Sequence, residues 1–262
     1  MGSCRNHPLF GPIKNMSEEN CPAPGATAEA SVQDVVIFAM ASLAETRESH
    51  SRNHILRVQH YLKVLAQTLK DHPRFVVALS PAQITALYQS APLYDMGTIG
   101  IPDRILLKPA ALTVAEFEIM KTHTTLGFEA LLHAEKTLGR DIPFLQTAKE
   151  LTLSHQEKWD GTGYPNGLSG DQIPVSARLM AIADVYDALT NDRVYKAGVP
   201  HDKAVQVIFQ GRGSHFDPDM VDAFIEIQEE FRLIAQCYAD SDADMQKKID
   251  YLANAIAEDA GT

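Results

Sequence analysis

The chain has 262 residues, 45% of them hydrophobic, and a formal net charge of −11. This length can bury a sizeable core without disulfides or a structural metal. The acidic balance argues against DNA or RNA binding, because a surface that follows phosphates needs clustered Lys and Arg. The sequence has no apolar run long enough for a membrane span and no Cys-x-x-Cys pair among its three cysteines, so we expect a cytoplasmic globular protein without a disulfide framework.

Apolar residues recur at helical spacing along most of the chain. Residues 1–30 lack such periodicity and are interpreted as a flexible leader. Thr113 is expected to cap the helix that follows it, with Glu116 completing a capping box. No strand pattern or internal repeat appears, so the sequence predicts one all-α domain. The expected helices cover 31–48, 54–70, 84–94, 114–138, 143–156, 175–190, 201–210, 217–236 and 243–257, with a loop at 95–113.

Polar side chains interrupt these apolar patterns at a few positions. Asp95 follows an apolar run, His123 lies within an expected helix, and Asp184 lies within the run ARLMAIADVYDALT. His155 begins the segment HQEKWDGTGYP, where a carboxylate and a tight glycine turn follow at once. For each residue alone, a hydrogen-bonded core position is a better explanation than a metal ligand. Together, imidazole and carboxylate groups on separate helices favour iron, manganese, zinc or nickel, and paired ions about 4 Å apart serve phosphoester hydrolysis.

Several segments, in the same order, resemble the HD-GYP family, the cyclic di-GMP phosphodiesterase branch of the HD metal-dependent phosphohydrolases. They are RNHILRVQHYLKVLA, APLYDMGTIGIPDRILLKPAALT, FEIMKTHTTLG, HQEKWDGTGYPNGLSGDQIP, ARLMAIADVYDALTNDRVYK and GSHFDPDMVDAF. The resemblance covers about residues 31–236. It implies an HD-domain helical bundle with a C-terminal HD-GYP helical extension over 31–240, followed by a C-terminal helix and tail at 241–262.

The resemblance also implies a binuclear metal site, with Asp95 as the bridging, catalytic carboxylate. The ligands carried over to this chain are His54, Asp95, His123, His155 and Asp184. The chain departs from the family pattern at four positions. Tyr94 replaces the histidine of the signature His-Asp pair, Thr98 replaces a lysine, Gln156 replaces a second histidine, and His50 replaces a glutamate.

These departures predict a weakened metal site with one or two ions. A phenol has a pKa of about 10 and must lose its proton to be a strong ligand, so Tyr94 is a poor substitute for an imidazole. His50 and Tyr94 are kept as additional candidate ligands. Arg193 and Lys196 match the family's phosphate-binding positions, and Tyr164 of the GYP loop is a candidate for substrate contact or for contact with diguanylate cyclase (GGDEF) domains.

Three functions follow as hypotheses. The first is a phosphodiesterase that linearises cyclic di-GMP. The second is a pseudoenzyme that binds cyclic di-GMP or a related nucleotide as a signalling sensor. The third is a non-catalytic interaction module that binds GGDEF domains through the GYP loop. Because several expected ligands are replaced, the sequence favours nucleotide binding that persists while hydrolysis is weak, altered or lost.

Overall fold

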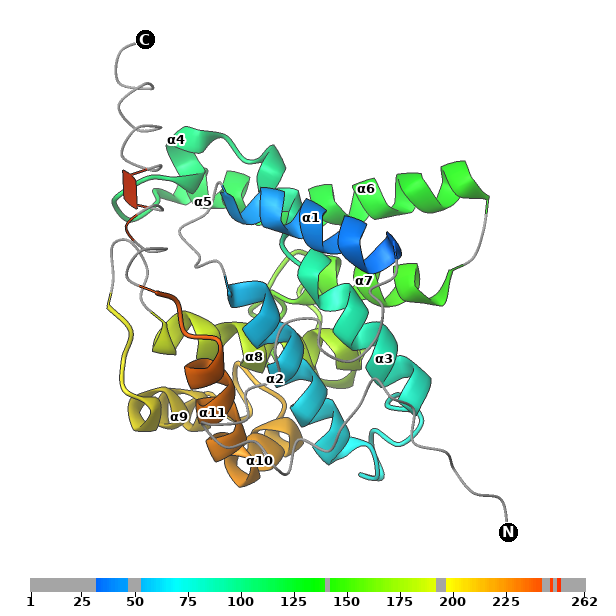
Figure 1. Cartoon of the computed structure of the whole chain (residues 1–262), viewed down its shortest axis with the longest axis vertical. Helices are drawn as coiled ribbons and strands as arrows, with labels where there is room; N and C mark the ends of the chain where they lie inside the picture. Colours follow the sequence, from blue (N-terminus) through cyan, green and yellow to red (C-terminus); the bar gives the residue numbers. More distant parts are fainter. Residues whose placement is uncertain are drawn as a thin grey trace.

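The computed structural model of the chain describes residues 32–46, 53–139, 142–191, 197–241, 246 and 249–250. Within these residues there is no strand, only an isolated bridge between Arg212 and Phe216, and the all-α prediction is confirmed (Figure 1). The α-helices are α1 (Val32–Thr46), α2 (His54–Leu69), α3 (Pro81–Ser90), α4 (Asp103–Leu106), α5 (Val114–Lys121), α6 (His123–Leu138), α7 (Pro143–Ser154), α8 (Val175–Thr190), α9 (His201–Gln210), α10 (Pro218–Glu226) and α11 (Gln228–Cys237). Three 3-10 helices lie between them: η2 (Ala91–Leu93), η3 (Met96–Gly100) and η4 (Gly170–Gln172).

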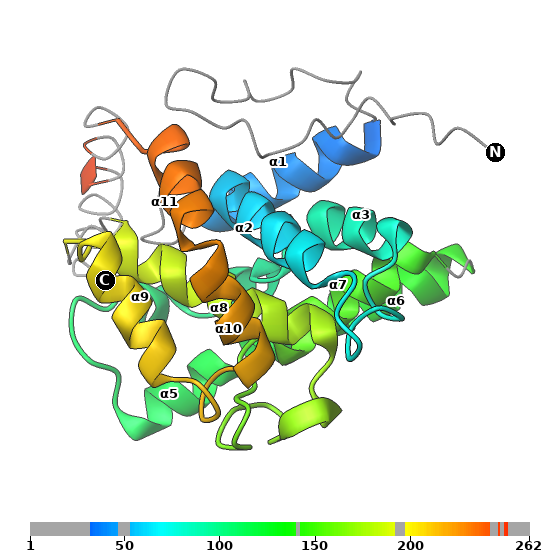
Figure 2. The same cartoon turned by 90° about the horizontal axis from the view of Figure 1, so that it is seen from below.

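Helix α2 forms the centre of the bundle. It packs against α3, α8, α10 and α11, and Figures 1 and 2 show it enclosed by these helices. Its Tyr61, Leu62 and Leu65 side chains are fully buried in the main apolar core. This central position means that any residue at the start of α2 is held rigidly against α8.

A smaller apolar cluster lies on the other side of the candidate site. Its buried residues are Ile37, Leu93, Leu131, Leu145 and Ala148. They tie α1 and η2 to the pair α6 and α7, which lie side by side in both views (Figures 1 and 2). This cluster fixes the two helices that carry His123 and His155 relative to the chain segment that carries Asp95.

Helix boundaries differ from the prediction at several places. The helix expected from residue 84 begins at Pro81, and the loop expected at 95–113 contains η3 and α4. The expected helix at 114–138 is broken at Thr122, whose hydroxyl donates to the carbonyl of Ile119 at 2.6 Å and competes with the helical pattern. The expected helix at 217–236 is broken at Ile227. The Thr113 capping box is confirmed, with the Glu116 carboxylate accepting the Thr113 backbone N–H at 2.7 Å.

Some sequence predictions fall partly or wholly outside the described residues. The leader at 1–30 lies outside them, as does most of the helix expected at 243–257. Cys237 at the end of α11 is disulfide-bonded, although the cysteine spacing predicted no disulfide framework. None of the helices in the described part of the chain is both long enough and apolar enough to span a membrane.

A buried ion pair joins α2 to α8. The Arg57 side chain is fully buried and its Nε donates to Asp187 Oδ1 at 2.6 Å, while its Nη1 donates to the Tyr238 carbonyl at 2.9 Å. Burial would raise the pKa of Asp187, but the charges of Arg57 and His54 outweigh burial and hold that pKa well below its usual range. Asp187 is therefore a carboxylate that bonds two cationic partners from the same helix.

We expect Asp187→Ala to lower the free energy of unfolding by about 3 to 5 kcal/mol, because it leaves the Arg57 charge buried without its main partner. Urea unfolding followed by circular dichroism measures this loss. The matched control is Asp222→Ala, which breaks the exposed ion pair with Arg212 at 2.7 Å and should shift the unfolding midpoint little. Equal shifts for the two variants would contradict the importance of the buried pair.

Candidate metal centre

Three side chains from different elements meet at one point. Asp95, between η2 and η3, places Oδ1 at 3.3 Å from His123 Nε2 and 3.1 Å from His155 Nε2. The two Nε2 atoms are 3.2 Å apart. His123 begins α6 and His155 follows the last residue of α7, and both are buried. In the described part of the chain, the ligand atoms of Asp95, His123 and His155 lie close enough together to hold one metal ion.

The second nitrogen of each imidazole is engaged with the backbone. His123 Nδ1 lies 2.8 Å from the Met120 carbonyl, and His155 Nδ1 lies 3.0 Å from the Leu151 carbonyl. A carbonyl can only accept, so each Nδ1 donates a hydrogen bond, and each Nε2 is the nitrogen that faces Asp95 and would bind an ion. Such outer hydrogen bonds orient metal-ligating histidines.

The spacing of these atoms fits a transition ion. Two ligand atoms about 2.0 to 2.1 Å from one ion lie about 2.8 to 3.0 Å apart in octahedral geometry and about 3.3 to 3.4 Å apart in tetrahedral geometry. The three measured separations, 3.1, 3.2 and 3.3 Å, lie between these limits. Burial would raise the pKa of Asp95, but hydrogen bonds with His123 and His155 outweigh it and hold that pKa well below its usual range. The donor set, two imidazoles and a carboxylate, suits iron, manganese, nickel or zinc.

Glycine at position 97 permits the approach of Asp95 to His123. A Cβ atom on Gly97 would lie 1.9 Å from the His123 carbonyl oxygen and 2.6 Å from the Gly127 backbone nitrogen. No side chain fits there, so η3 can pack on the first turn of α6 only with glycine at this position. The backbone contact brings the segment that carries Asp95 against the start of α6.

The Tyr94 hydroxyl joins two residues that the sequence assigned to the metal. His54 Nε2 lies 2.7 Å from the Tyr94 oxygen, and this hydroxyl donates to Asp184 Oδ1 at 3.0 Å. The Tyr94 ring is also edge-on to the His155 ring, with centroids 5.1 Å apart. The five expected ligands thus lie in one connected cluster, but His54 and Asp184 face the phenol.

A hydrogen-bonded chain runs from α8 through His54 to the phenol. His54 Nδ1 bonds Asp187 Oδ2 at 2.7 Å. Burial lowers the pKa of His54, but the charge and hydrogen bond of Asp187 outweigh it and raise the pKa to about 9. His54 is therefore an imidazolium that donates to Asp187 and to Tyr94, and Tyr94 in turn donates to Asp184.

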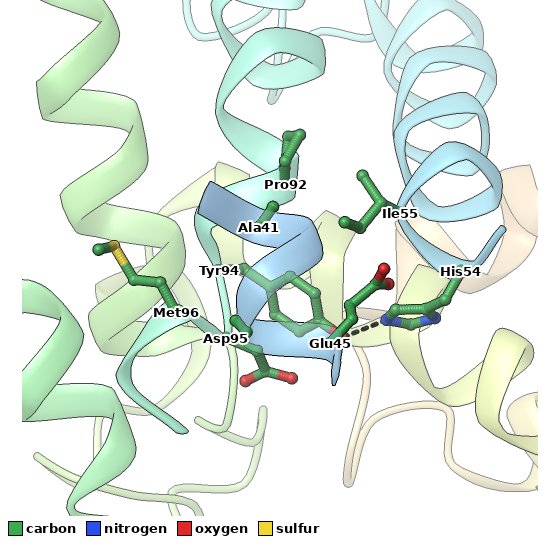
Figure 3. Close-up of a pocket in the computed structure, with 9 residues that line it drawn as sticks. Ala41, Glu45, His54, Ile55, Pro92, Tyr94, Asp95 and Met96 are labelled. Carbon is green, nitrogen blue, oxygen red and sulfur yellow. Dashed lines mark hydrogen bonds between the residues drawn. The ribbon is translucent and has the colours of Figure 1, made fainter. Parts of the chain in front are cut away.

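A small cavity of about 20 Å³ borders this chain of hydrogen bonds. Figure 3 shows the carboxylate of Glu45, from α1, directed toward His54, and Asp95 directed away from the Tyr94 ring. The lining residues are Ala41, Ala44, Glu45, His54, Ile55, Pro92, Tyr94, Asp95 and Met96. Helix α1 therefore closes the site on the side opposite His123 and His155.

The loop after α7 covers the other side of the metal centre. The Tyr164 ring lies edge-on to the His123 ring, with centroids 6.2 Å apart. Burial and the nearby Asp95 charge raise the pKa of Tyr164, so its hydroxyl is neutral. The buried carboxylate of Glu157 accepts the backbone N–H groups of Asn166 at 2.8 Å and Leu168 at 3.0 Å. Glu157 thereby holds the loop that carries Tyr164.

The remaining sequence candidates divide into two groups. Arg193, Lys196 and His50 lie outside the described residues. Thr98 is buried, and its hydroxyl donates to the Asp95 carbonyl at 2.7 Å, which braces the turn between η2 and η3.

Sequence reasoning missed the residues that support the ligands. The sequence assigned no supporting role to Gly97, Glu157 or Asp187. In the structure Gly97 allows η3 to pack on α6, Asp187 hydrogen-bonds His54, and Glu157 holds the loop that carries Tyr164. The available signals were a glycine two residues after Asp95, a glutamate two residues after His155 and an aspartate three residues after Asp184.

With this geometry in place, comparison with known proteins identifies the class. Residues 39–220 match the HD domain family, so the chain belongs to that family. A protein of Vibrio cholerae named probable cyclic di-GMP phosphodiesterase is 53% identical over 214 residues, which cover 82% of this chain and 48% of that protein. Another from the same bacterium, named cyclic di-GMP phosphodiesterase, is 51% identical over 80% of this chain and 42% of its own length. The HD-GYP resemblance is confirmed.

A solved structure agrees on the fold. The crystal structure of a cyclic GMP-AMP specific phosphodiesterase of Vibrio cholerae superposes with a TM-score of 0.53 at 16% identity, covering 84% of this chain and 53% of that one. At this identity the likeness concerns the fold alone. The chain spans about half the length of the curated relatives it matches.

We expect Gly97→Ala to weaken binding of a divalent transition ion at least about tenfold, because the added Cβ separates η3 from α6 and moves Asp95 away from His123. Titration with manganese(II), followed by electron paramagnetic resonance, measures the affinity. Gly100→Ala is the matched control on the same 3-10 helix, because its Cβ would meet only the end of the Leu126 side chain. Unchanged affinity in Gly97→Ala would contradict the role of this contact.

Proposed function

We propose that this chain is the phosphodiesterase-type domain of an HD-GYP protein in cyclic di-GMP signalling and that its metal centre is incomplete. One divalent transition ion, iron, manganese, nickel or zinc, binds tightly at Asp95, His123 and His155. The cyclic dinucleotide binds, while its hydrolysis is slow. The observation that carries this proposal is the Tyr94 hydroxyl, which bonds both His54 and Asp184.

The phenol opposes a second ion for two physical reasons. His54 and Asp184 would have to release their hydrogen bonds to Tyr94 before they could act as ligands. The phenol itself, with an ordinary pKa of about 10, would have to lose a proton to be a strong ligand. Because Tyr94 is buried, the broken hydrogen bonds would not be replaced by water.

A single ion limits the chemistry. An ion held by these residues would neutralise the charge on one phosphoryl oxygen. Two ions about 4 Å apart would stabilise both the attacking and the leaving oxygen. The chain's own contribution is orientation: the carbonyls of Met120 and Leu151 fix the two histidines, and the Thr98 hydroxyl braces Asp95. With one ion, no second ion would stabilise the leaving oxygen, so we expect slow turnover.

The substrate class follows from the relatives. Two of them are named for cyclic di-GMP, and the solved structural neighbour is titled for cyclic GMP-AMP. Both ligands are cyclic purine dinucleotides with two phosphodiester groups. We propose Arg193 and Lys196 as phosphate contacts and Tyr164 as a residue that faces the bound ligand.

A role in protein recognition is the alternative. The GYP loop exposes Asn166 and Gly167 to solvent, and a GGDEF domain is the partner we predicted for it from the sequence. Measurements of metal content and of nucleotide binding separate the two roles, because an interaction module needs neither the metal nor the dinucleotide.

We expect about one tightly bound metal ion per chain in protein loaded with manganese(II) and then desalted, and about two in Tyr94→His. The imidazole adds a ligand and frees His54 and Asp184 from the phenol. Elemental analysis measures the ratio, and spin coupling between two manganese ions provides a second readout. Tyr94→Phe is the matched control: it removes the hydroxyl without adding a ligand and should stay at one. Two ions in the wild type would overturn the incomplete centre.

We also expect cyclic di-GMP to bind in isothermal titration while its cleavage stays slow in a product assay with manganese(II) or iron(II). The triple change Tyr94→His, Thr98→Lys and Gln156→His should accelerate cleavage, because it returns the ligands and the lysine found in the family pattern. Fast cleavage by the wild type that is lost in Asp95→Ala would refute the slow-turnover proposal. Neither binding nor cleavage would favour the interaction module.

A further inference from the structure

We infer that Phe117 and Lys121 on α5, together with Tyr164, form a purine-nucleotide subsite beside the metal centre, with Phe117 stacking on a base and Lys121 binding a phosphate. The inference rests on the proposed function, because the ligand is the cyclic purine dinucleotide. It assigns recognition residues that are not metal ligands, of which Phe117 and Lys121 precede His123 on the adjoining helix α5.

A continuous set of contacts leads from the metal centre to this surface. The Tyr164 ring is edge-on to His123 on one side and edge-on to Phe117 on the other, with centroids 6.2 and 6.0 Å apart. Lys121 Nζ lies 5.9 Å from the Tyr164 ring centre and 5.6 Å from the Phe117 ring centre. An aromatic side chain and an ammonium group therefore stand next to each other, one ring away from a candidate metal ligand.

The protein core does not account for the position of Phe117. Helix α5 buries none of its residues, and Phe117 remains 44% exposed. The Phe117 and Tyr164 ring planes stand at 85° to each other, so Tyr164 is not stacked flat on Phe117. Stacking of a base on such a face is worth about 1 to 3 kcal/mol by alanine substitution, or about fivefold to 150-fold in affinity.

Lys121 is available for a phosphate. Its ammonium pairs with Glu118 at 2.6 Å, but the two side chains are 27% and 60% exposed. Exposed pairs of this kind contribute little, so exchanging Glu118 for a phosphate costs little. The exchange is favourable because the ligand carries two phosphodiester charges that the carboxylates of Asp95 and Asp184 repel. The Lys121 ammonium offsets this repulsion.

The test uses the full chain loaded with manganese(II), with cyclic di-GMP, GMP and inorganic phosphate as separate probes in isothermal titration. Phe117→Ala should weaken cyclic di-GMP and GMP about tenfold and leave phosphate unchanged. Lys121→Gln should weaken all three probes, more strongly at low salt, and Lys121→Arg should retain them. Ile119→Ala, on the same helix, and Lys136→Gln, near the end of α6, are matched controls that should bind like the wild type. Metal content, measured in parallel, should stay constant in every variant.

The outcomes separate the two proposals. If the wild type binds cyclic di-GMP and both Phe117→Ala and Lys121→Gln bind it equally well, the subsite is wrong and the proposed function stands. If Phe117→Ala weakens phosphate as much as GMP, the stacking role is wrong. If the metal-loaded wild type binds no probe, the proposed function fails and the subsite fails with it.

Discussion

The buried carboxylate of Asp187 is the constraint on which the site depends. Because Arg57 is fully buried, α2 and α8 can pack only if its charge is met, and Asp187 meets it with two hydrogen bonds. The same carboxylate bonds His54 Nδ1, which fixes the direction of His54 Nε2. The pairing that holds two central helices together therefore also decides what His54 offers to the candidate metal centre.

Tyr94 is the natural completion of this arrangement. An imidazolium donates through both nitrogens, so its second proton needs an acceptor inside the protein, and the phenol oxygen supplies it at 2.7 Å. The phenol hydroxyl then donates its own hydrogen bond to the Asp184 carboxylate. Charge and hydrogen bonding are satisfied without a metal ion between His54 and Asp184, whereas Asp95, His123 and His155 bring three potential ligand atoms close together.

The sequence predicted the helices well, because helical periodicity is a local pattern, and the family segments put Asp95, His123 and His155, which the structure brings together, among the candidate ligands. It identified Tyr94 as a departure but could not say which atoms its hydroxyl would bond. The break at Thr122 escaped detection because the apolar pattern continues through it, although it places His123 at the start of α6. The need for Gly97 is a tertiary effect, since the clash that excludes a side chain comes from the backbone of α6. Expectations at Arg193 and Lys196 lie outside the described residues and stay predictions.

The hydrogen bonds between Glu157 and the loop have a consequence for the stability of the loop. Glu157 lies two residues after His155, and its carboxylate holds the amides of Asn166 and Leu168 at the exposed end of the GYP segment. A molecule that displaced those amides would leave the buried Glu157 carboxylate without these two hydrogen bonds, which costs free energy because water does not replace them. The segment from Asn166 to Leu168 therefore resists displacement although Asn166 and Gly167 are exposed.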